Sequence, residues 1–214
     1  MIKSVVVLIS GSGSNLQAII DAASRSTHFK VRGVLSNKAD AFGLVRAKNA
    51  AIETAWIDHK AFDSRESFDS AMMQQIDAWG ADLVVLAGFM RILSSDFVRH
   101  YAGRLINIHP SLLPKYKGLN THQRALDEGE FEHGCTVHFV NEELDGGAPI
   151  IHAATPILPN DTVHSLQQRV HTLEHQIYPI AVDWFTADRL TASGASAELD
   201  SKPLGPSGIR FNSL

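Results

Sequence analysis

Short apolar segments alternate with amphipathic segments along the first half of the chain. The apolar segments are rich in β-branched residues, a composition typical of strands that are covered on both faces. The amphipathic segments repeat apolar residues three and four positions apart, which is the helical period. Strands are therefore expected at 4–10, 31–36, 51–57 and 82–87, and helices from about residue 16 to 23, at 39–49 and around 68–79.

Repeated alternation of strand and helix predicts an α/β fold with a doubly wound, mainly parallel sheet flanked by helices. The pattern changes after Pro114, where a helix is expected at 119–127 and strands at 136–140 and 149–155. An Asp-Gly turn between these two strands suits an antiparallel hairpin or a crossing loop, so we expect antiparallel additions in the C-terminal third. A last apolar stripe runs from Leu166 to Ile177, and Pro179 is expected to kink or interrupt that helix.

The chain length of 214 residues fits a single domain of this type. We place the domain at residues 1–187 and divide it into an N-terminal half at 1–100 and a second half at 101–187. Residues 188–214 are rich in Ser, Gly and Pro, so a loosely packed C-terminal tail is expected there.

Composition narrows the choice of partners and compartment. The net charge of −4 disfavours a bulk nucleic-acid surface. The single cysteine, Cys135, excludes an intrachain disulfide and a multi-cysteine metal site. The N-terminus lacks a signal-peptide pattern, and no apolar run approaches the ~20 residues of a membrane span. We therefore expect a cytoplasmic protein that binds neither nucleic acid nor a membrane.

A polar pair marks the next expected strand, at 105–109. Side chains alternate faces along a strand, so Asn107 and His109 share one face, roughly 6.5–7 Å apart by strand rise. Pro110 lacks a backbone N–H and ends the strand, at the edge where open α/β sheets bind ligands. Either residue alone is more often structural. Together they form a candidate catalytic pair, because an imidazole transfers protons near neutral pH and an amide N–H stabilises an oxyanion.

The glycine-rich turn at 11–15 lies between the first strand and the first helix, where free N–H groups attract anions. A dinucleotide fingerprint needs a third glycine, but Leu16 occupies that position, and Asn37 stands where an acidic residue is wanted. The Gly-Lys-Ser/Thr of a P-loop is also missing. The turn therefore favours a phosphomonoester, and the alternative is a tight turn without a ligand.

Asp145 belongs to an Asp-Gly-Gly turn, and most aspartates in such turns only shape the backbone. Asp145 is a candidate because of its position, since the strand before it can lie beside the strand of Asn107 and His109. The carboxylate would then reach the imidazole and stabilise its charged form, which suits proton transfer.

The other candidate residues have ordinary explanations. His133 and His138 lack a third ligand at a convincing spacing, so no metal site is expected. His171 and His175 are four apart on a helix, where a solvated face is favoured over a metal site. Arg65 is either a solvated helix charge or a clamp for a carboxylate, since guanidinium pairs with carboxylates through two bonds.

Several motifs together resemble those of the folate-dependent formyltransferases, over about residues 2–185. The resemblance is carried by ISGSGSNLQ at 9–17, LAGFMRIL at 86–93, NIHPSLLP at 107–114, HGCTVHF at 133–139 and DGG at 145–147. Lys117 stands where some members have proline, so the loop after Pro114 departs from their pattern at this position. The tail matches weakly, and nothing is carried over to it.

This resemblance implies transfer of a formyl group from 10-formyltetrahydrofolate to the amine of 5-phosphoribosylglycinamide, a step of purine biosynthesis. The partners implied are these two small molecules, with no metal, in a monomer or homodimer. The half at 1–100 would bind the phosphate, and the half at 101–187 would hold the folate and catalytic groups.

The resemblance also implies roles for individual residues. The catalytic residues would be Asn107, His109 and Asp145. The ribonucleotide would be bound by Gly13, Ser14, Asn15 and Glu174. The folate would be bound by Arg65, Met90, Arg91, Ile92, Leu93 and Asn107.

Three other functions stay open at this point. A formyltetrahydrofolate hydrolase shares the central motif but usually carries an extra N-terminal regulatory domain. A methionyl-tRNA formyltransferase normally carries a further C-terminal domain and a more basic surface. A non-catalytic nucleotide-binding module is the third, because a fold alone never implies chemistry.

Overall fold

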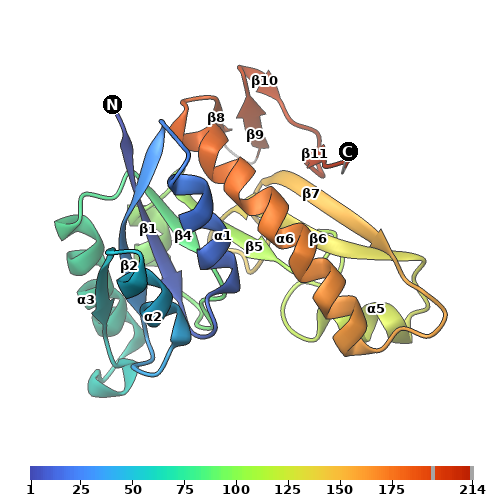
Figure 1. Ribbon diagram of the computed structural model, residues 1–214, viewed down its shortest axis with the longest axis horizontal. Coiled ribbons are helices and arrows are strands. Elements are labelled where there is room, and N and C mark those ends of the chain that lie inside the picture. The colour runs from blue at the N-terminus through green and yellow to red at the C-terminus, as the bar shows by residue number, and fades with distance from the viewer. Residues whose placement is uncertain (194–195, 213–214) are drawn as a thin grey trace.

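The computed structural model describes residues 1–193 and 196–212. An eight-stranded sheet forms its centre, with helices on both faces (Figure 1). The strand order is β11-β7-β6-β5-β4-β1-β2-β3, with β1 (Lys3–Ile9), β2 (Phe29–Ser36), β3 (Glu53–Trp56), β4 (Leu83–Leu86), β5 (Leu105–His109), β6 (Glu132–Phe139), β7 (Pro149–Pro156) and β11 (Ile209–Arg210). The helices are α1 (Ser14–Ala23), α2 (Phe42–Asn49), α3 (Arg65–Ala78), α4 (Ser95–His100), α5 (Thr121–Asp127) and α6 (Val163–Thr186), with a 3-10 turn η1 (His59–Ala61).

Strand β6 runs in the direction opposite to its neighbours in the sheet. Strands β1 to β5 pair in parallel, whereas β6 is antiparallel to both β5 and β7. The predicted fold class, a mainly parallel α/β sheet with antiparallel additions in the C-terminal third, is therefore confirmed.

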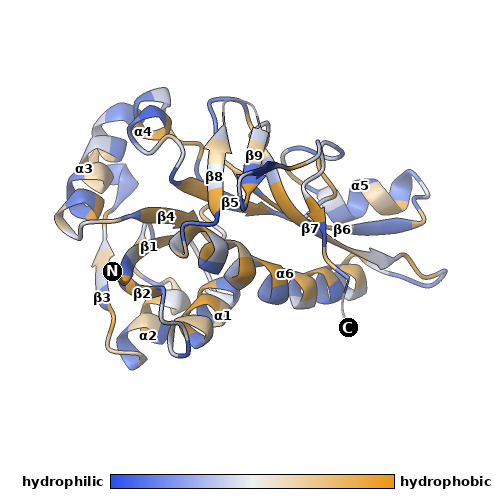
Figure 2. Ribbon diagram, turned by 90° about the horizontal axis from the view of Figure 1, so that it is seen from above, coloured by the Kyte–Doolittle hydropathy of each residue, from blue (hydrophilic) through white to orange (hydrophobic). Residues whose placement is uncertain are grey.

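Both faces of the sheet are covered because alternate residues of each strand point to opposite sides. Val5 and Val7 of β1 pack in the core under α1, α2 and α6, whereas Val6 and Leu8 pack under α3 and α4. Figure 2 shows the apolar strands between these helix layers, with polar residues on the outer helix faces. Such two-sided burial explains why the strands read as continuous apolar runs in the sequence.

Helix α6 spans 24 residues and begins at a capping box on Thr162. Of the two effects expected of Pro179, a kink or an interruption, the interruption does not occur, because the helix continues through this residue to Thr186. Proline removes one helical N–H, but packing against the sheet continues past it. The buried Tyr178 hydroxyl donates to the backbone oxygens of Leu86 at 2.9 Å and Ile106 at 3.2 Å, which attaches α6 to β4 and β5.

The segment after residue 187 is not loosely packed, contrary to expectation. It forms a small antiparallel sheet from β8 (Leu190–Ser193), β9 (Ser196–Leu199) and β10 (Lys202–Pro203), and then adds β11 to the main sheet. Leu190 and Ala197 are each 1% exposed and join the core, and Phe211 packs against it. The sequence pattern did not indicate this packing, because the apolar residues of the segment are widely spaced among Ser, Gly and Pro. The boundary near residue 187 stays a prediction.

Replacing Gly134 of β6 with alanine should destabilise the fold. A Cβ at this position would lie 1.9 Å from the backbone oxygen of Ala153 in β7, so the two strands would have to separate. Overpacking of this kind typically costs about 1–3 kcal/mol. Urea denaturation of Gly134→Ala should show this loss. Gly205→Ala is the control, because no atom of residues 1–193 and 196–212 lies within 4 Å of its added Cβ, and an equal loss there would contradict the steric explanation.

Candidate active site

The register between β5 and β6 gathers four polar side chains on one face of the sheet. It pairs Asn107 with His138 and His109 with Thr136. Paired residues of antiparallel strands point to the same side. The intervening Ile106 and Ile108 of β5 belong to the core cluster under α6, so the polar group lies on the opposite face.

The His109 ring is 6% exposed and both of its nitrogens face oxygen atoms. Nε2 lies 2.8 Å from the backbone oxygen of Tyr116, a bond in which the ring nitrogen donates. Nδ1 lies 3.4 Å from Oδ2 of Asp145. A hydrogen on Nδ1 would point towards the Asp145 carboxylate.

Asp145 reaches the histidine from the loop between β6 and β7, which folds over this face of the sheet. Its side chain is 9% exposed, and its backbone is left-handed with φ of 48°. Oδ2 accepts the N–H of Gly118 at 2.9 Å, and Oδ1 lies 3.8 Å from Nε2 of His138. The carboxylate is therefore fixed between two loops and two histidines.

His138 orients the amide of Asn107. Its Nδ1–H donates to the backbone oxygen of Phe139 at 2.8 Å, which leaves Nε2 with a lone pair. Burial lowers the pKa of His138, so the ring is neutral at pH 7. The Asn107 amide nitrogen lies 3.2 Å from that Nε2 and donates to it. One amide hydrogen of Asn107 remains for another acceptor.

The structure thus brings together Asn107, His109 and Asp145 as the sequence predicted, but sequence reasoning missed His138 and Thr136. The Thr136 hydroxyl donates to the Ser111 oxygen at 2.7 Å and accepts the Leu113 N–H at 3.1 Å, which holds the loop after β5. Once the strand at 136–140 is placed beside β5, the period of two puts residues 136 and 138 on one face. That periodicity was the available signal.

The glycine turn after β1 has the geometry expected of an anion site. Gly13 adopts φ of 70° just before α1, and a Cβ there would lie 2.6 Å from the Cα of Gly43 at the start of α2. The turn therefore requires glycine. Ser14 and Asn15 open α1, so their N–H groups belong to its free first turn.

Asn15 also links this turn to α6. Its amide nitrogen donates to Oε2 of Glu174 at 2.7 Å, and its buried Oδ1 has no hydrogen-bond partner among the described residues. Glu174 is 4% exposed, and burial raises the pKa of its carboxyl group. The expectation of a solvated face is therefore wrong for this part of α6, where the flanking His171 and His175 are half-buried.

The proposed ribonucleotide residues and the proposed catalytic residues form two separate groups. Within residues 1–193 and 196–212, no hydrogen bond or ion pair connects a residue of one group with a residue of the other. The ribonucleotide residues lie at the start of α1 and on α6, two helices that pack on the face of the sheet to which Ile106 and Ile108 point, whereas Asn107 and His109 point to the opposite face. A substrate that reaches both must therefore extend from one face of the sheet to the other.

The loop after β4 presents apolar side chains to solvent. Met90 and Ile92 are 66% and 63% exposed, although large apolar residues are usually buried. The loop is held by its backbone, since the Met90 N–H donates to the Ser10 hydroxyl at 2.9 Å. Leu93 packs inward against the core under α3 and α4.

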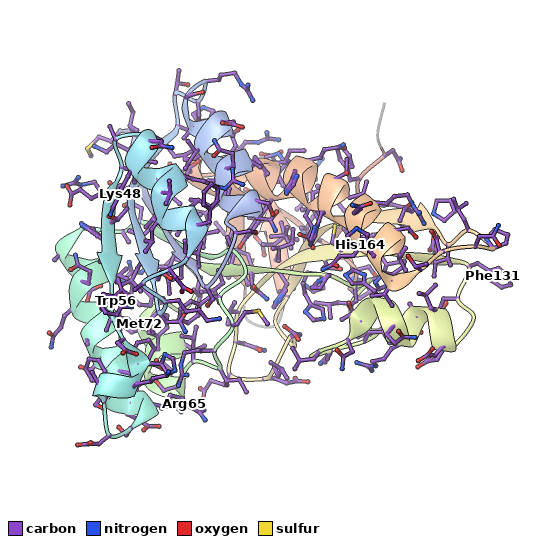
Figure 3. All side chains as sticks on the ribbon, turned by 60° about the horizontal axis from the view of Figure 1, so that its bottom comes forward. Lys48, Trp56, Arg65, Met72, Phe131 and His164 are labelled. Atoms are coloured by element: carbon purple, nitrogen blue, oxygen red, sulfur yellow. The ribbon has the colours of Figure 1, made fainter. Side chains whose placement is uncertain are left out.

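Arg91 and Arg65 lie beside the same buried acid. The Arg91 guanidinium lies 5.4 Å from the ring centre of Phe68, and both arginines act electrostatically on Asp69. Burial raises the pKa of Asp69, which accepts the Ser94 N–H at 2.6 Å. Arg65 is exposed at the start of α3, at the opposite end of the molecule from Phe131 (Figure 3).

His122 and His133 form a buried pair next to Pro110, at the start of the loop at 110–118. Nε2 of His133 and Nδ1 of His122 are 3.1 Å apart, and His133 also bonds to the backbone of Pro110. Burial and the neighbouring histidines lower the pKa of each ring to about 4. Both rings are therefore neutral at pH 7.

No group of three His, Cys, Asp or Glu side chains suited to a metal ion occurs in the described part of the chain. Among the same residues, no helix has the length and apolar character needed to cross a membrane.

Comparison with known proteins gives consistent names. Residues 3–182 match the family model described as formyl transferase. The "Phosphoribosylglycinamide formyltransferase" of Escherichia coli is 55% identical over 206 residues, which is 96% of this chain and 97% of that protein. The protein of the same name from Haemophilus influenzae is 50% identical over 207 residues, 96% of this chain and 98% of that protein.

A solved structure also resembles the whole fold. It is the phosphoribosylglycinamide formyltransferase of Coxiella burnetii in complex with CHES, which superposes with a TM-score of 0.95 at 52% identity. The match covers 99% of this chain and 100% of the Coxiella burnetii chain.

The buried histidines should make stability fall in acid. A histidine whose pKa drops from 6.5 to about 4 on folding is protonated first in the unfolded chain. Its contribution is therefore complete above pH 6.5 and is lost as the pH falls towards 4. In His133→Gln the slope of unfolding free energy against pH should decrease over this range, by up to about 1.4 kcal/mol per pH unit. Denaturation at several pH values measures it, with the exposed His164→Gln as control, and equal slopes in both variants would refute the assignment.

Proposed function

The chain belongs to the formyl transferase family, and on that premise we propose that it transfers the formyl group of 10-formyltetrahydrofolate to the amine of 5-phosphoribosylglycinamide. It is an enzyme of formyl transfer, and its closely similar relatives are named for this step of purine biosynthesis. The observation that carries the chemical part of the proposal is the contact of Asp145 with His109, beside the oriented amide of Asn107.

The proposed reaction is a direct transfer. The lone pair of the substrate amine forms a bond to the formyl carbon, and the carbonyl electrons move to oxygen. The resulting tetrahedral intermediate loses a proton from the attacking nitrogen, gains one on the folate nitrogen, and then breaks the carbon bond to the folate. No covalent enzyme intermediate is required, since Cys135 is fully buried and its pKa is raised by burial.

The catalytic residues would act on charge and protons. The free amide hydrogen of Asn107 and the Nδ1–H of His109 are the donors suited to a developing oxyanion. Asp145 faces that Nδ1–H, so it would stabilise the imidazolium and accept the proton released by the amine, directly or through water. His138 would keep the donor side of Asn107 in place.

The ribonucleotide would bind between the turn at 13–15 and Glu174, the buried acid of α6. The first N–H groups of α1, from Ser14 and Asn15, would hold the phosphate. Glu174 would position the glycinamide part, and its bond from Asn15 fixes the carboxyl group near the turn. Oδ1 of Asn15, which accepts no hydrogen bond within the described part of the chain, would accept one from a substrate hydroxyl or amide.

The folate would bind along the loop after β4. The exposed side chains of Met90 and Ile92 offer apolar surface to a flat ring, with Leu93 and Arg91 beside them. Exposed Arg65 would pair with the glutamate carboxylates at the other end of the cofactor, because guanidinium binds carboxylates through two parallel bonds. Asn107 would meet the formyl group between the two substrates.

An absorbance assay with 10-formyl-dideazafolate and the ribonucleotide tests the proposal. Folate product should form only when the ribonucleotide is present, and it should disappear in His109→Ala. Product without the ribonucleotide would indicate a hydrolase instead. A folded protein inactive with both substrates would leave only a phosphate-binding module.

Asn107→Ala should lower kcat by about 10²–10³, because that is the usual effect of removing an oxyanion donor. The KM of the ribonucleotide should change little, since its proposed contacts lie on α1 and α6. Steady-state kinetics on both substrates separates the two effects. Turnover close to that of the unchanged enzyme would rule out the oxyanion role.

A further inference from the structure

We propose that Tyr116 is the positioning residue of His109. Its backbone oxygen fixes the ring of the histidine, and its buried phenol holds that oxygen in place. The inference rests on the proposed function only in treating His109 as catalytic. The hydrogen-bonding part concerns this chain's own residues and is measurable without turnover.

The carbonyl of Tyr116 decides which way His109 presents its two nitrogens. It accepts the Nε2–H at 2.8 Å, so only the Nδ1 side remains to face Asp145 and a substrate. In a histidine, the hydrogen bond made by one ring nitrogen determines which nitrogen carries the proton and so what the other nitrogen can do. Loss of this acceptor would free the ring to rotate or to change tautomer.

The backbone at Tyr116 needs support to keep this carbonyl in position. Its φ of 56° is left-handed, which is uncommon for a residue with a bulky side chain. Such conformations persist where surrounding contacts determine them, and they cluster at functional sites. Glycine would adopt this φ without strain, so the side chain at 116 must contribute something else.

The phenol supplies the anchor. It is close to two acceptors, Oε2 of Glu128 at 2.8 Å and Oε1 of Glu130 at 2.9 Å. Burial and these carboxylates raise the pKa of Tyr116, so the hydroxyl remains a donor. The residue is 7% exposed, and Arg124 stacks over its ring at 5.0 Å. These contacts come from α5 and the turn after it, outside the proposed catalytic trio.

The same short loop also sets the second partner of the histidine. Gly118, two residues after Tyr116, donates its N–H to Oδ2 of Asp145 at 2.9 Å. The Arg124 guanidinium donates to the Lys117 oxygen between them at 2.8 Å. The loop therefore holds both the ring nitrogen and the carboxylate, and the phenol anchors the loop to the turn after α5.

Tyr116→Phe tests this proposal, because it removes only the hydroxyl. We expect kcat to fall about tenfold while both KM values stay within about twofold, since the substrates' proposed contacts are elsewhere. We also expect loss of the protected Nε2–H resonance of His109 in ¹⁵N-labelled protein. That resonance is identified by its absence in His109→Ala.

Tyr101→Phe is the matched control. Tyr101 is also buried, and its hydroxyl donates to Oδ1 of Asp77 at 3.0 Å in the layer of α3 and α4. It should lose stability but keep kcat and the His109 resonance. Glu128→Ala is a second variant at an exposed position, for the case that Tyr116→Phe does not fold. It should lower kcat in the same direction, by a smaller factor.

The outcomes separate the positioning role from a structural one. Loss of the resonance and of kcat in Tyr116→Phe, with both kept in Tyr101→Phe, supports the proposal. Retention of the resonance and of kcat in Tyr116→Phe overturns it. Equal losses of kcat in the two tyrosine variants, in proportion to lost stability, also overturn it. If the unchanged protein lacks formyl transfer, the proposed function fails, whereas the resonance still tests the bond between residues 109 and 116.

Discussion

The antiparallel register between β5 and β6 is the constraint on which the rest of the active site depends. Asn107 faces His138 and His109 faces Thr136 only in this alignment. A slip of one residue would turn every side chain of one strand to the other face and place apolar residues beside the catalytic pair. The register is fixed by burial, since Val137 and Ile108 on the intervening positions belong to the core under α6.

Around that register, the site is assembled from loops that are tied to one another by backbone groups. The Tyr116 oxygen, the Gly118 N–H and the Met90 N–H each bind a polar side chain from a different segment. Backbone groups move only with their whole segment, so these contacts hold side chains more firmly than pairs of flexible side chains would. The buried Tyr178 hydroxyl attaches α6 to the same strands, which keeps Glu174 near their carboxyl ends.

The fold was predictable from sequence to the extent that burial is periodic. The parallel strands followed from apolar runs, and the carboxyl end of β5 followed from Pro110. For β6 and β7, the Asp-Gly turn between two runs suited either an antiparallel hairpin or a crossing loop, and the structure has the antiparallel pair. The catalytic pair followed from a period of two. The role of His138 was missed because it depends on the register of two strands, which a single strand's pattern does not contain. The packed tail was missed because its few apolar residues are separated by turns.

The two-residue strand β11 has a consequence for how this protein behaves at high concentration. It pairs with β7 through Ile209 and Ile151, and the Phe211 N–H extends the contact to the oxygen of His152. Without it, the outer edge of β7 would present unpaired backbone groups to other molecules, and such edges recruit strands from neighbouring chains. Strand β11 thus covers the backbone groups of Ile151 and His152 on this edge, which makes it a segment to retain when the protein is shortened or tagged.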